Sequence, residues 1–547
     1  MKHIFPYLLF ATPFVAYANE STNITNEFNK FQQQNKQQLE QIQRDKQQAW
    51  ISQHQYQNAP KAENLSDLSQ QCLPYQELKI IGTTLIDSSS FTPKVGECIN
   101  EARLNKLSQD LTKAYLEKGY IHNPFKFEDD NSGVLVMRVT EGKIAKINSN
   151  SSRLNLVMLT PNMIGKALNV KDLDQALDQA NRMSGSQVTV DVLPDSEGNI
   201  ELQFVNEERS RIGGHIGIDN FASKRHQRWQ MKGGVYIDSP LGLSDTLSVN
   251  ISNTLHALQH NFNRSASLFY SLPYGYWNFS LFGAVSQFQT RIPLQYTTAE
   301  QKGHSTQLGL KADYTAHRGE NHISTLYSQL NYYRNKSYFQ GSLIDLQSPT
   351  LSSTQFGINH IQIFPKATLV IDVNYERGLT WFNAIRNQGR DQPEGQFNKW
   401  NTDFQLSYYY TLNDQLFHHQ HNLSGQYSSN YLPAIKQADL LSRYTVRGFN
   451  DLSSSAEKSL ILQNNFGWVH NQNNWQIEPY LLFDLGIIKN TSAYSHSEKA
   501  LSYGIGAKIQ IGNRASINLE WATGRYFQSK AIINQERSIN LSTILRY

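Results

Sequence analysis

Long apolar runs are the first feature that this sequence lacks. After the N-terminal stretch, no run approaches the ~18 apolar residues that a transmembrane helix needs, so the sequence does not predict a helical membrane anchor. A strong excess of one charge is also missing. The formal net charge of +4 is too small to argue for nucleic acid as a partner.

Signatures of catalysis are absent as well. The sequence contains no G-x-S-x-G motif and no phosphate-binding loop, which leaves a barrel lipase or a nucleotide-driven motor without support. The 16 histidines are scattered without the spacing of metal ligands. We therefore predict no catalytic residue, no cofactor and no metal, and we do not expect an enzyme.

The N-terminus indicates the compartment in which the chain works. Met1-Lys2-His3 is a short basic start, Ile4 to Phe14 is mostly apolar, and Ala16-Tyr17-Ala18 is a small-x-small cleavage site. This pattern predicts a secretory signal peptide over residues 1–18. An exported chain without a predicted helical anchor, and rich in amphipathic strands, points to the outer membrane of a Gram-negative cell.

Cysteine is almost absent, with Cys72 and Cys98 as the only two. In an oxidising periplasm these residues are expected to form a disulfide, which would contribute ~3 kcal/mol in the chain-entropy model. The alternative is a pair of free buried thiols. Export favours the disulfide.

Strict alternation of apolar and polar residues is what the sequence has in abundance. The last ten residues put one set on a single strand face, with Ile544 as the exception: Ile539, Leu541, Thr543, Leu545 and Tyr547. Residues 501–512 alternate in the same way, and glycines and charges fill their second face. That face suits a water-filled lumen better than the core of a soluble sandwich.

This pattern extends over residues 209–547 and predicts a transmembrane β-barrel. At ~20 residues for one strand and its connection, the region would hold roughly sixteen antiparallel strands. Tyrosine, phenylalanine and tryptophan often stand at the predicted strand ends, where interfacial girdles require them.

The segment before the barrel divides into four parts. Residues 19–54 lack the glycine and proline that would break their polar helical stretch, and a helix solvated on nearly every side is what a plug in a polar lumen would need. The alternative is a weak coiled coil or a partly disordered tail. Residues 55–71 read as a linker. Residues 72–143 and 144–208 each mix short strands with helices and predict two small α+β modules.

The second module is expected to contain one strand followed by two helices. After a strand that begins at Ile144, we place a short helix near Pro161 to Ile164. A longer helix is expected from Val170 to Met183.

The motifs along the chain together resemble one family, the outer-membrane two-partner secretion transporters. In the first module they are Cys72, Cys98, Tyr115-x-x-x-Gly119-Tyr120 and Glu141-Gly142; in the second they are Leu168-Asn169, Asp172 to Leu177 and Asn181-Arg182-Met183. In the barrel they are Ser239 to Asp245, Ser271 to Trp277, Val446-Arg447-Gly448-Phe449 and Leu482-x-Asp484-x-Gly486. The order and spacing of the set make chance a poor explanation.

The resemblance implies a plug helix, two periplasmic POTRA domains and a sixteen-stranded barrel. It also pairs Arg447, carried inward on a long loop, with Asp484 on a barrel strand. Gly448, Phe449 and Gly486 would complete this site, and we expect it to have a structural and gating role without bond chemistry.

The function implied is secretion of a large exoprotein through the barrel, in the manner of type V secretion. The partner's N-terminal secretion domain would dock on the POTRA domains, and the cargo would be an adhesin, a haemolysin or a contact-dependent growth-inhibition toxin. Other expected partners are the lipid bilayer, the general outer-membrane assembly machinery and periplasmic chaperones. The alternatives are an outer-membrane protein insertase and a passive porin; the porin leaves residues 72–205 without a role.

Overall fold

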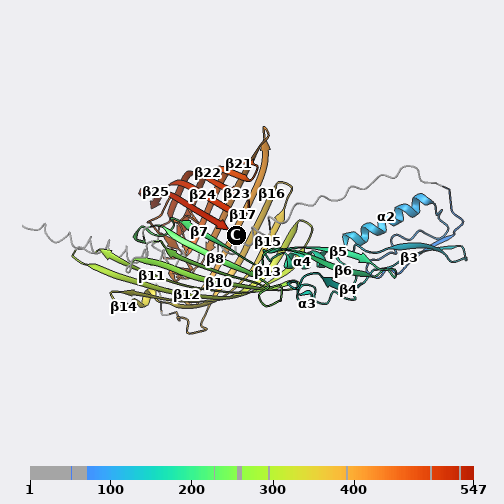
Figure 1. Cartoon of the computed structure of the whole chain (residues 1–547), viewed down its shortest axis with the longest axis horizontal. Helices are drawn as coiled ribbons and strands as arrows, with labels where there is room; N and C mark the ends of the chain where they lie inside the picture. Colours follow the sequence, from blue (N-terminus) through green and yellow to red (C-terminus); the bar gives the residue numbers. More distant parts are fainter. Residues whose placement is uncertain are drawn as a thin grey trace, which may run out of the picture.

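The computed structural model describes residue 51 and residues 71–226, 228–255, 261–293, 296–387, 389, 392–492, 496–528 and 531–547. The predicted signal peptide, the predicted plug helix apart from Ile51, and residues 55–70 of the predicted linker lie outside these residues. Within them, no helix is long and apolar enough to cross a membrane. Two α+β modules extend from one end of a closed barrel (Figure 1).

The first module is a three-stranded sheet with one helix packed on it. Its elements are β1 (Glu77–Ile81), α2 (Glu101–Glu117), β2 (Phe125–Asp129) and β3 (Val134–Val139). The order is β1-β3-β2, with β1 parallel and β2 antiparallel to β3. A disulfide joins Cys72 to Cys98, just before α2, with a Cα–Cα distance of 5.4 Å.

The Tyr115-x-x-x-Gly119-Tyr120 motif ends α2. Gly119 takes a φ of +90°, and its N–H donates to Leu116 O at 2.8 Å while the N–H of Tyr120 donates to Tyr115 O at 2.9 Å. This is a Schellman motif, in which a residue with positive φ closes the helix. The spacing seen in the sequence is therefore a helix stop.

The Glu141-Gly142 motif of the first module also has a structural role, which lies in the contacts of the Glu141 carboxylate. The Tyr115 hydroxyl donates to its Oε1 at 2.8 Å, and the N–H groups of Thr84 and Leu85 donate to the same oxygen at 2.7 and 2.8 Å. Burial alone would raise the pKa of Glu141, but these hydrogen bonds outweigh it and hold the pKa below its ordinary value. Glu141 thus ties the β1–α2 connection to the end of the helix.

The second module repeats the sheet pattern with two helices. It contains β4 (Ile144–Ser149), α3 (Leu156–Leu159), α4 (Val170–Ala180), β5 (Ser186–Pro194) and β6 (Ile200–Glu208), in the sheet order β4-β6-β5. Its hydrophobic core is formed by buried residues of α4 and the sheet, including Leu173, Ala176, Leu202 and Phe204.

The expected short helix near Pro161 to Ile164 is wrong in position. The helix lies earlier, at Leu156–Leu159, because the Asn155 side chain accepts a hydrogen bond from Met158 N and begins it. Pro161 follows the last turn, where a residue without an N–H cannot continue the helix.

Sixteen long antiparallel strands close the barrel, which confirms the predicted fold class. The first eight are β7 (Ile212–Asp219), β8 (Gln230–Asp238), β9 (Thr246–Thr254), β10 (Phe262–Tyr274), β11 (Trp277–Pro293), β12 (Thr298–Arg318), β13 (His322–Phe339) and β15 (Thr350–Ile363). The others are β16 (Ala367–Leu379), β17 (Asn398–Leu412), β18 (Gln415–Tyr427), β21 (Lys458–Gln472), β22 (Trp475–Lys489), β23 (Glu498–Ile511), β24 (Ala515–Gln528) and β25 (Ala531–Arg546). The hairpin piece β14 (Ser342–Leu343) pairs with β13, and the short 3₁₀ turns η1 (Lys224–His226) and η2 (Asp345–Gln347) lie in connections.

The barrel closes where β25 pairs with β7. Five residue pairs are in register there, Ser542 to Arg546 against His215 to Asp219, compared with 17 between β11 and β12. Beyond the seam the Asn220 side chain donates to Ile539 O at 2.7 Å and accepts from Leu541 N at 2.9 Å.

The alternation in the sequence becomes two faces of the wall. Along β22 exposed and buried residues alternate almost strictly, so that Leu481, Phe483 and Leu485 face outward while Leu482 and Asp484 are buried. The last residue, Tyr547, is outward and exposed. An apolar outer wall around polar inner side chains is the arrangement of a membrane barrel.

Candidate functional site

The connection between β18 and β21, residues 428–457, folds into the barrel, and we call it the inward loop. It carries η3 (Ala434–Lys436), β19 (Ala438–Asp439) and β20 (Ser455–Ala456). Its apolar residues form a buried cluster with the barrel wall, of which Leu440 and Val446 are fully buried. The apolar cluster and the polar contacts below hold the loop inside.

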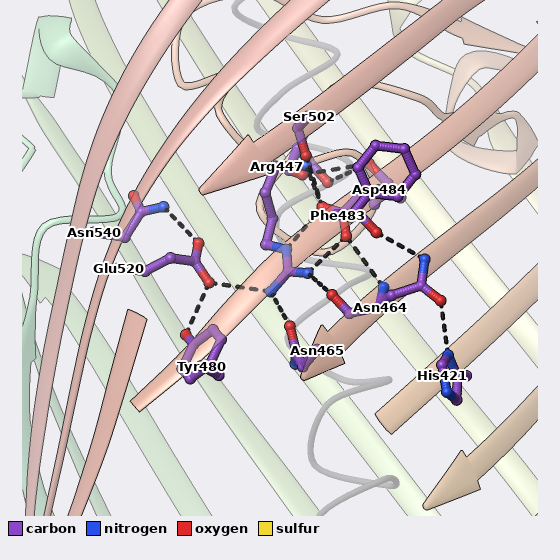
Figure 2. Close-up of polar contacts among 12 residues, drawn as sticks. His421, Arg447, Asn464, Asn465, Tyr480, Phe483, Asp484, Ser502, Glu520 and Asn540 are labelled. Carbon is purple, nitrogen blue, oxygen red and sulfur yellow. Dashed lines mark hydrogen bonds and ion pairs between the residues drawn. The ribbon is translucent and has the colours of Figure 1, made fainter. Parts of the chain in front are cut away.

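Arg447 and Asp484 meet as a two-point ion pair (Figure 2). Arg447 Nε donates to Asp484 Oδ2 at 2.8 Å and Nη2 donates to Oδ1 at 2.6 Å. The backbone N–H of Arg447 also donates to Oδ2, at 3.1 Å. Such a fork fixes both distance and orientation, so it holds the tip of the inward loop in one position.

The remaining donors of the guanidinium are also satisfied. Nη1 donates to Asn465 Oδ1 at 2.8 Å and to Glu520 Oε2 at 3.2 Å, and Nη2 donates to Asn464 O at 3.2 Å. On the other side, the Ser502 hydroxyl donates to Asp484 Oδ2 at 2.9 Å. Asp484 is 0% exposed and Arg447 is 6% exposed. A buried ion pair is tolerated when its hydrogen bonds are complete in this way.

Glu520 on β24 is a member of this site that the sequence did not reveal. Its carboxylate accepts from Arg447, from the Tyr480 hydroxyl at 3.1 Å and from Asn540 Nδ2 at 3.3 Å (Figure 2). The signal available was only its place on the polar face of a strand, which many lumen residues share. The pair is therefore part of a network that joins the inward loop to β22, β24 and β25.

The predicted glycines allow close approach of the backbones. Gly448 has a φ of +94°, and a Cβ there would lie 2.5 Å from Gly524 N on β24. A Cβ on Gly486 would lie 2.5 Å from Leu440 Cδ1 of the loop. Phe449 is buried, and its ring covers Gly524, where a Cβ would meet it at 2.4 Å. The five predicted residues of the loop–barrel site thus come together.

A second anchor fixes the inward loop to another part of the wall, at β16 and β17, of which β16 lies four strands from β22 in the barrel order. Lys436 Nζ donates to the Glu376 carboxylate on β16, and Lys399 Nζ on β17 lies 3.0 Å from the other oxygen of that carboxylate. The Ser353 hydroxyl donates to Glu376 at 2.6 Å, and Lys436 Nζ lies 3.9 Å above the Tyr333 ring. The side chains of the three charged residues are only 4–5% exposed.

Sequence reasoning missed this second anchor. Glu376 and Lys399 are direct register partners on neighbouring strands, and opposite charges so placed stabilise a sheet. That register was not predicted, and nothing in the sequence around Lys436 sets it apart from other loop lysines. The inward loop is consequently held to the barrel wall at two places, by Lys436 and by Arg447.

The second module is joined to the barrel mouth by several polar contacts of α4. Gln175 and Gln179 donate to Gly275 O at 3.2 and 3.0 Å, and the Tyr276 hydroxyl donates to Asp172 at 2.6 Å. Arg318 at the end of β12 forms a buried ion pair with Asp178 of α4. The Ser271 to Trp277 motif is therefore a joint between module and barrel.

The lumen between α4 and the inward loop contains a cavity of about 670 Å³, and most of the residues that line it are of polar types. Its lining includes Asp313, Asp372 and Asp403 from the strands and Arg182 from the second module. Ile51, the one described residue of the predicted plug helix, is helical and packs against the cluster Ile361, Ile363 and Val370. Ile361 and Val370 both line this cavity.

A sixteen-stranded barrel with two periplasmic α+β modules, an inward loop and a polar lumen defines the class of outer-membrane transporters with POTRA domains. The chain belongs to the family of haemolysin secretion/activation proteins of the ShlB/FhaC/HecB type, whose model matches residues 198–509. Residues 73–142 match the ShlB-type POTRA domain, and residues 143–194 match a second POTRA model.

Characterised relatives support the same assignment. The chain is 32% identical over 508 residues to the hemolysin transporter protein HpmB of Proteus mirabilis, an alignment that covers 89% of each protein. It is 28% identical over 418 residues to the outer membrane transporter CdiB of Dickeya dadantii, covering 75% of this chain and 74% of that relative.

A solved structure shares the fold. CdiB from Escherichia coli superposes with a TM-score of 0.81 at 23% identity, covering 95% of this chain and 98% of that one. The protein is thus a two-partner secretion transporter of the outer membrane, with its POTRA domains in the periplasm. Transporters of this family secrete a partner exoprotein, and the family favours this function over the insertase alternative.

Proposed function

We propose that this transporter exports one large exoprotein, which it recognises through the partner's N-terminal secretion domain. Its relatives are transporters named for haemolysin and for the CdiB system, so the proposed cargo is a haemolysin, an adhesin or a contact-dependent growth-inhibition toxin. The observation that carries the proposal is a polar lumen placed directly beyond two sheets with open edges.

The open edges support docking of an extended chain. In the described part of the protein, β1 and β2 each pair only with β3, and β4 and β5 each pair only with β6. An edge strand offers unpaired N–H and C=O groups, to which a segment of cargo adds as a further strand. Leu193 on β5 and Phe127 on β2 are exposed and would supply apolar contacts.

Export in cells tests the proposal. We expect a gene beside this one to encode a large exported protein, and we expect that protein to reach the medium or cell surface only when the transporter is present. Without the transporter it should remain periplasmic, while the amounts of unrelated outer-membrane barrels stay unchanged. A general loss of those barrels would instead support an insertase and contradict the proposal.

We also propose that residues 19–54 form a plug that occupies the resting lumen and leaves during transport. The contact of Ile51 with the lumen cluster supports this. A polar helix that leaves a wet lumen gives up little apolar burial, so its release during transport costs little. Deleting residues 19–54 is expected to raise single-channel conductance in planar bilayers, because it removes the obstruction from the lumen. Ile51→Glu should raise it less, and Ile51→Val should leave it unchanged. Equal conductance of the deletion and the parent would refute the plug.

The site around Arg447 and Asp484 holds and gates the loop without bond chemistry, so we propose that the protein is not an enzyme. The bilayer, the outer-membrane assembly machinery and periplasmic chaperones serve its biogenesis, and nucleic acid is not a partner. The proposed domains are the signal peptide 1–18, plug 19–54, linker 55–71, POTRA domains 72–143 and 144–208, and barrel 209–547.

A further inference from the structure

Two of the most exposed large apolar side chains of the periplasmic half stand beside the barrel. Val157 on α3 is 75% exposed, and Leu241 in the turn between β8 and β9 is 67% exposed. Neither is used in the loop site, the lumen or the open sheet edges. Side chains of this kind in such places mark a contact surface.

Hydrogen bonds join the segment before Val157 to the turn that carries Leu241. Asn155, which begins α3, donates through its backbone N–H to Ser244 Oγ at 2.8 Å and through Nδ2 to Gly242 O at 3.1 Å. The Ser239 hydroxyl donates to Arg153 O at 3.0 Å. The start of α3 and the 239–245 turn are therefore bound to one another by hydrogen bonds and together expose Val157 and Leu241.

This unit is continuous with the aromatic end of the outer wall. Gly275 N, in the turn between β10 and β11, donates to Met158 O at 2.8 Å, so the residue after Val157 contacts the turn that leads to Trp277. Trp277 is 41% exposed on the outer face, and its ring centroid lies 4.8 Å from that of Tyr314. Figure 1 shows α3 beside the barrel end of the second module.

Aromatic residues at strand ends mark the level of the membrane interface in an outer-membrane barrel. Trp277 and Tyr314 thus place this level next to α3. An apolar side chain at the level of this aromatic rim meets the boundary between the lipid head groups and the acyl chains.

We propose that α3 of the second POTRA domain and the 239–245 turn insert Val157 and Leu241 into the periplasmic leaflet of the outer membrane. The ligand is phospholipid, met at the boundary of head group and acyl chain. The contact, together with the α4 joint, would hold the domain at a fixed height and tilt below the membrane.

Lipid-borne quenching tests this in the full-length protein. Both native cysteines are in the disulfide, so Val157→Cys and Leu241→Cys can each be labelled with an environment-sensitive fluorophore. The protein is placed in nanodiscs of phosphatidylethanolamine and phosphatidylglycerol, some of which carry a nitroxide high on the acyl chain. Both probes are expected to lose fluorescence with nitroxide lipid and to show blue-shifted emission.

Two matched positions calibrate the result. Leu281→Cys, on the outward face of β11 and 42% exposed, should be quenched as a lipid-facing control; Leu116→Cys, 50% exposed on α2 of the first module, should not. If the probes at positions 157 and 241 both behave like the one at 116, the proposal is overturned. Protection from lipid together with cross-linking between copies through position 157 would overturn it in favour of a protein interface.

Discussion

Replacing Arg447 by alanine is expected to remove most cargo secretion while the barrel stays inserted and folded. The substitution leaves Asp484 fully buried and without its cation, and breaking such a pair costs about 3–5 kcal/mol. It also frees Glu520 and Asn465 from the guanidinium. The measurement is secreted cargo per folded transporter, with heat-modifiable mobility on gels as the folding control.

Variants of the same pair separate its role from general damage. Asp484→Ala should resemble Arg447→Ala, and the double variant should be little worse than either, because members of one interacting pair are not additive. The exchange Arg447→Asp with Asp484→Arg is not expected to restore secretion, since the loop geometry and the reach of a guanidinium are not symmetric. Normal secretion by both single variants would show that the pair has no role in transport.

Replacing Glu376 by alanine is expected to release the second anchor of the inward loop with an effect of similar size. It leaves Lys399 and Lys436 as two buried cations close together, each 4% exposed in its side chain. An unpaired buried charge costs about 3–5 kcal/mol, so the loop should leave its site rather than retain both. Limited proteolysis of residues 428–457 in intact cells measures the release.

Because Glu376 has two lysine partners, variants at this anchor are expected to expose the inward loop to protease to different extents. Lys436→Met keeps the Glu376–Lys399 pair and removes only the loop's hold, so it should expose the loop less than Glu376→Ala does. Glu300→Ala on β12 is the matched control, because its lysine partner is 43% exposed and a surface pair contributes only about 0–1 kcal/mol. Protease resistance of the Glu376→Ala loop equal to that of the parent would contradict the anchor.

The architecture was predictable because each strand of a membrane barrel faces two media. Leu481, Phe483 and Leu485 alternate with buried residues on β22 for that reason, and the same rule applies to the C-terminal strand. The Arg447 site could be proposed because its residues belong to short motifs that resemble a family. Pattern and motif together were therefore sufficient for the fold and for one of the two loop anchors.

The features that the sequence did not predict are the Lys436 anchor, the position of α3 and the joint of α4 with the barrel. The anchor and the joint depend on contacts between segments far apart in the sequence. Lys436 meets Glu376 only because the inward loop folds into the lumen, and the path of a loop is not encoded in the alternation of the strands beside it. The position of α3 depended on which residue begins the helix, and the side-chain acceptor at Asn155 decided this over the proline that follows. The joint of α4 with Gly275 also needed the relative position of two domains.

The two anchors tie the inward loop to Glu376 on β16 and to Asp484 on β22, strands that lie four places apart in the barrel order. A loop fixed at both points braces the arc of wall between these two strands and resists a change in the distance between them. A change in the circumference of the barrel would then occur in the remaining strands, which include the seam where β25 and β7 share only five register pairs. We therefore expect the loop to limit changes in the shape of the pore as well as to obstruct it.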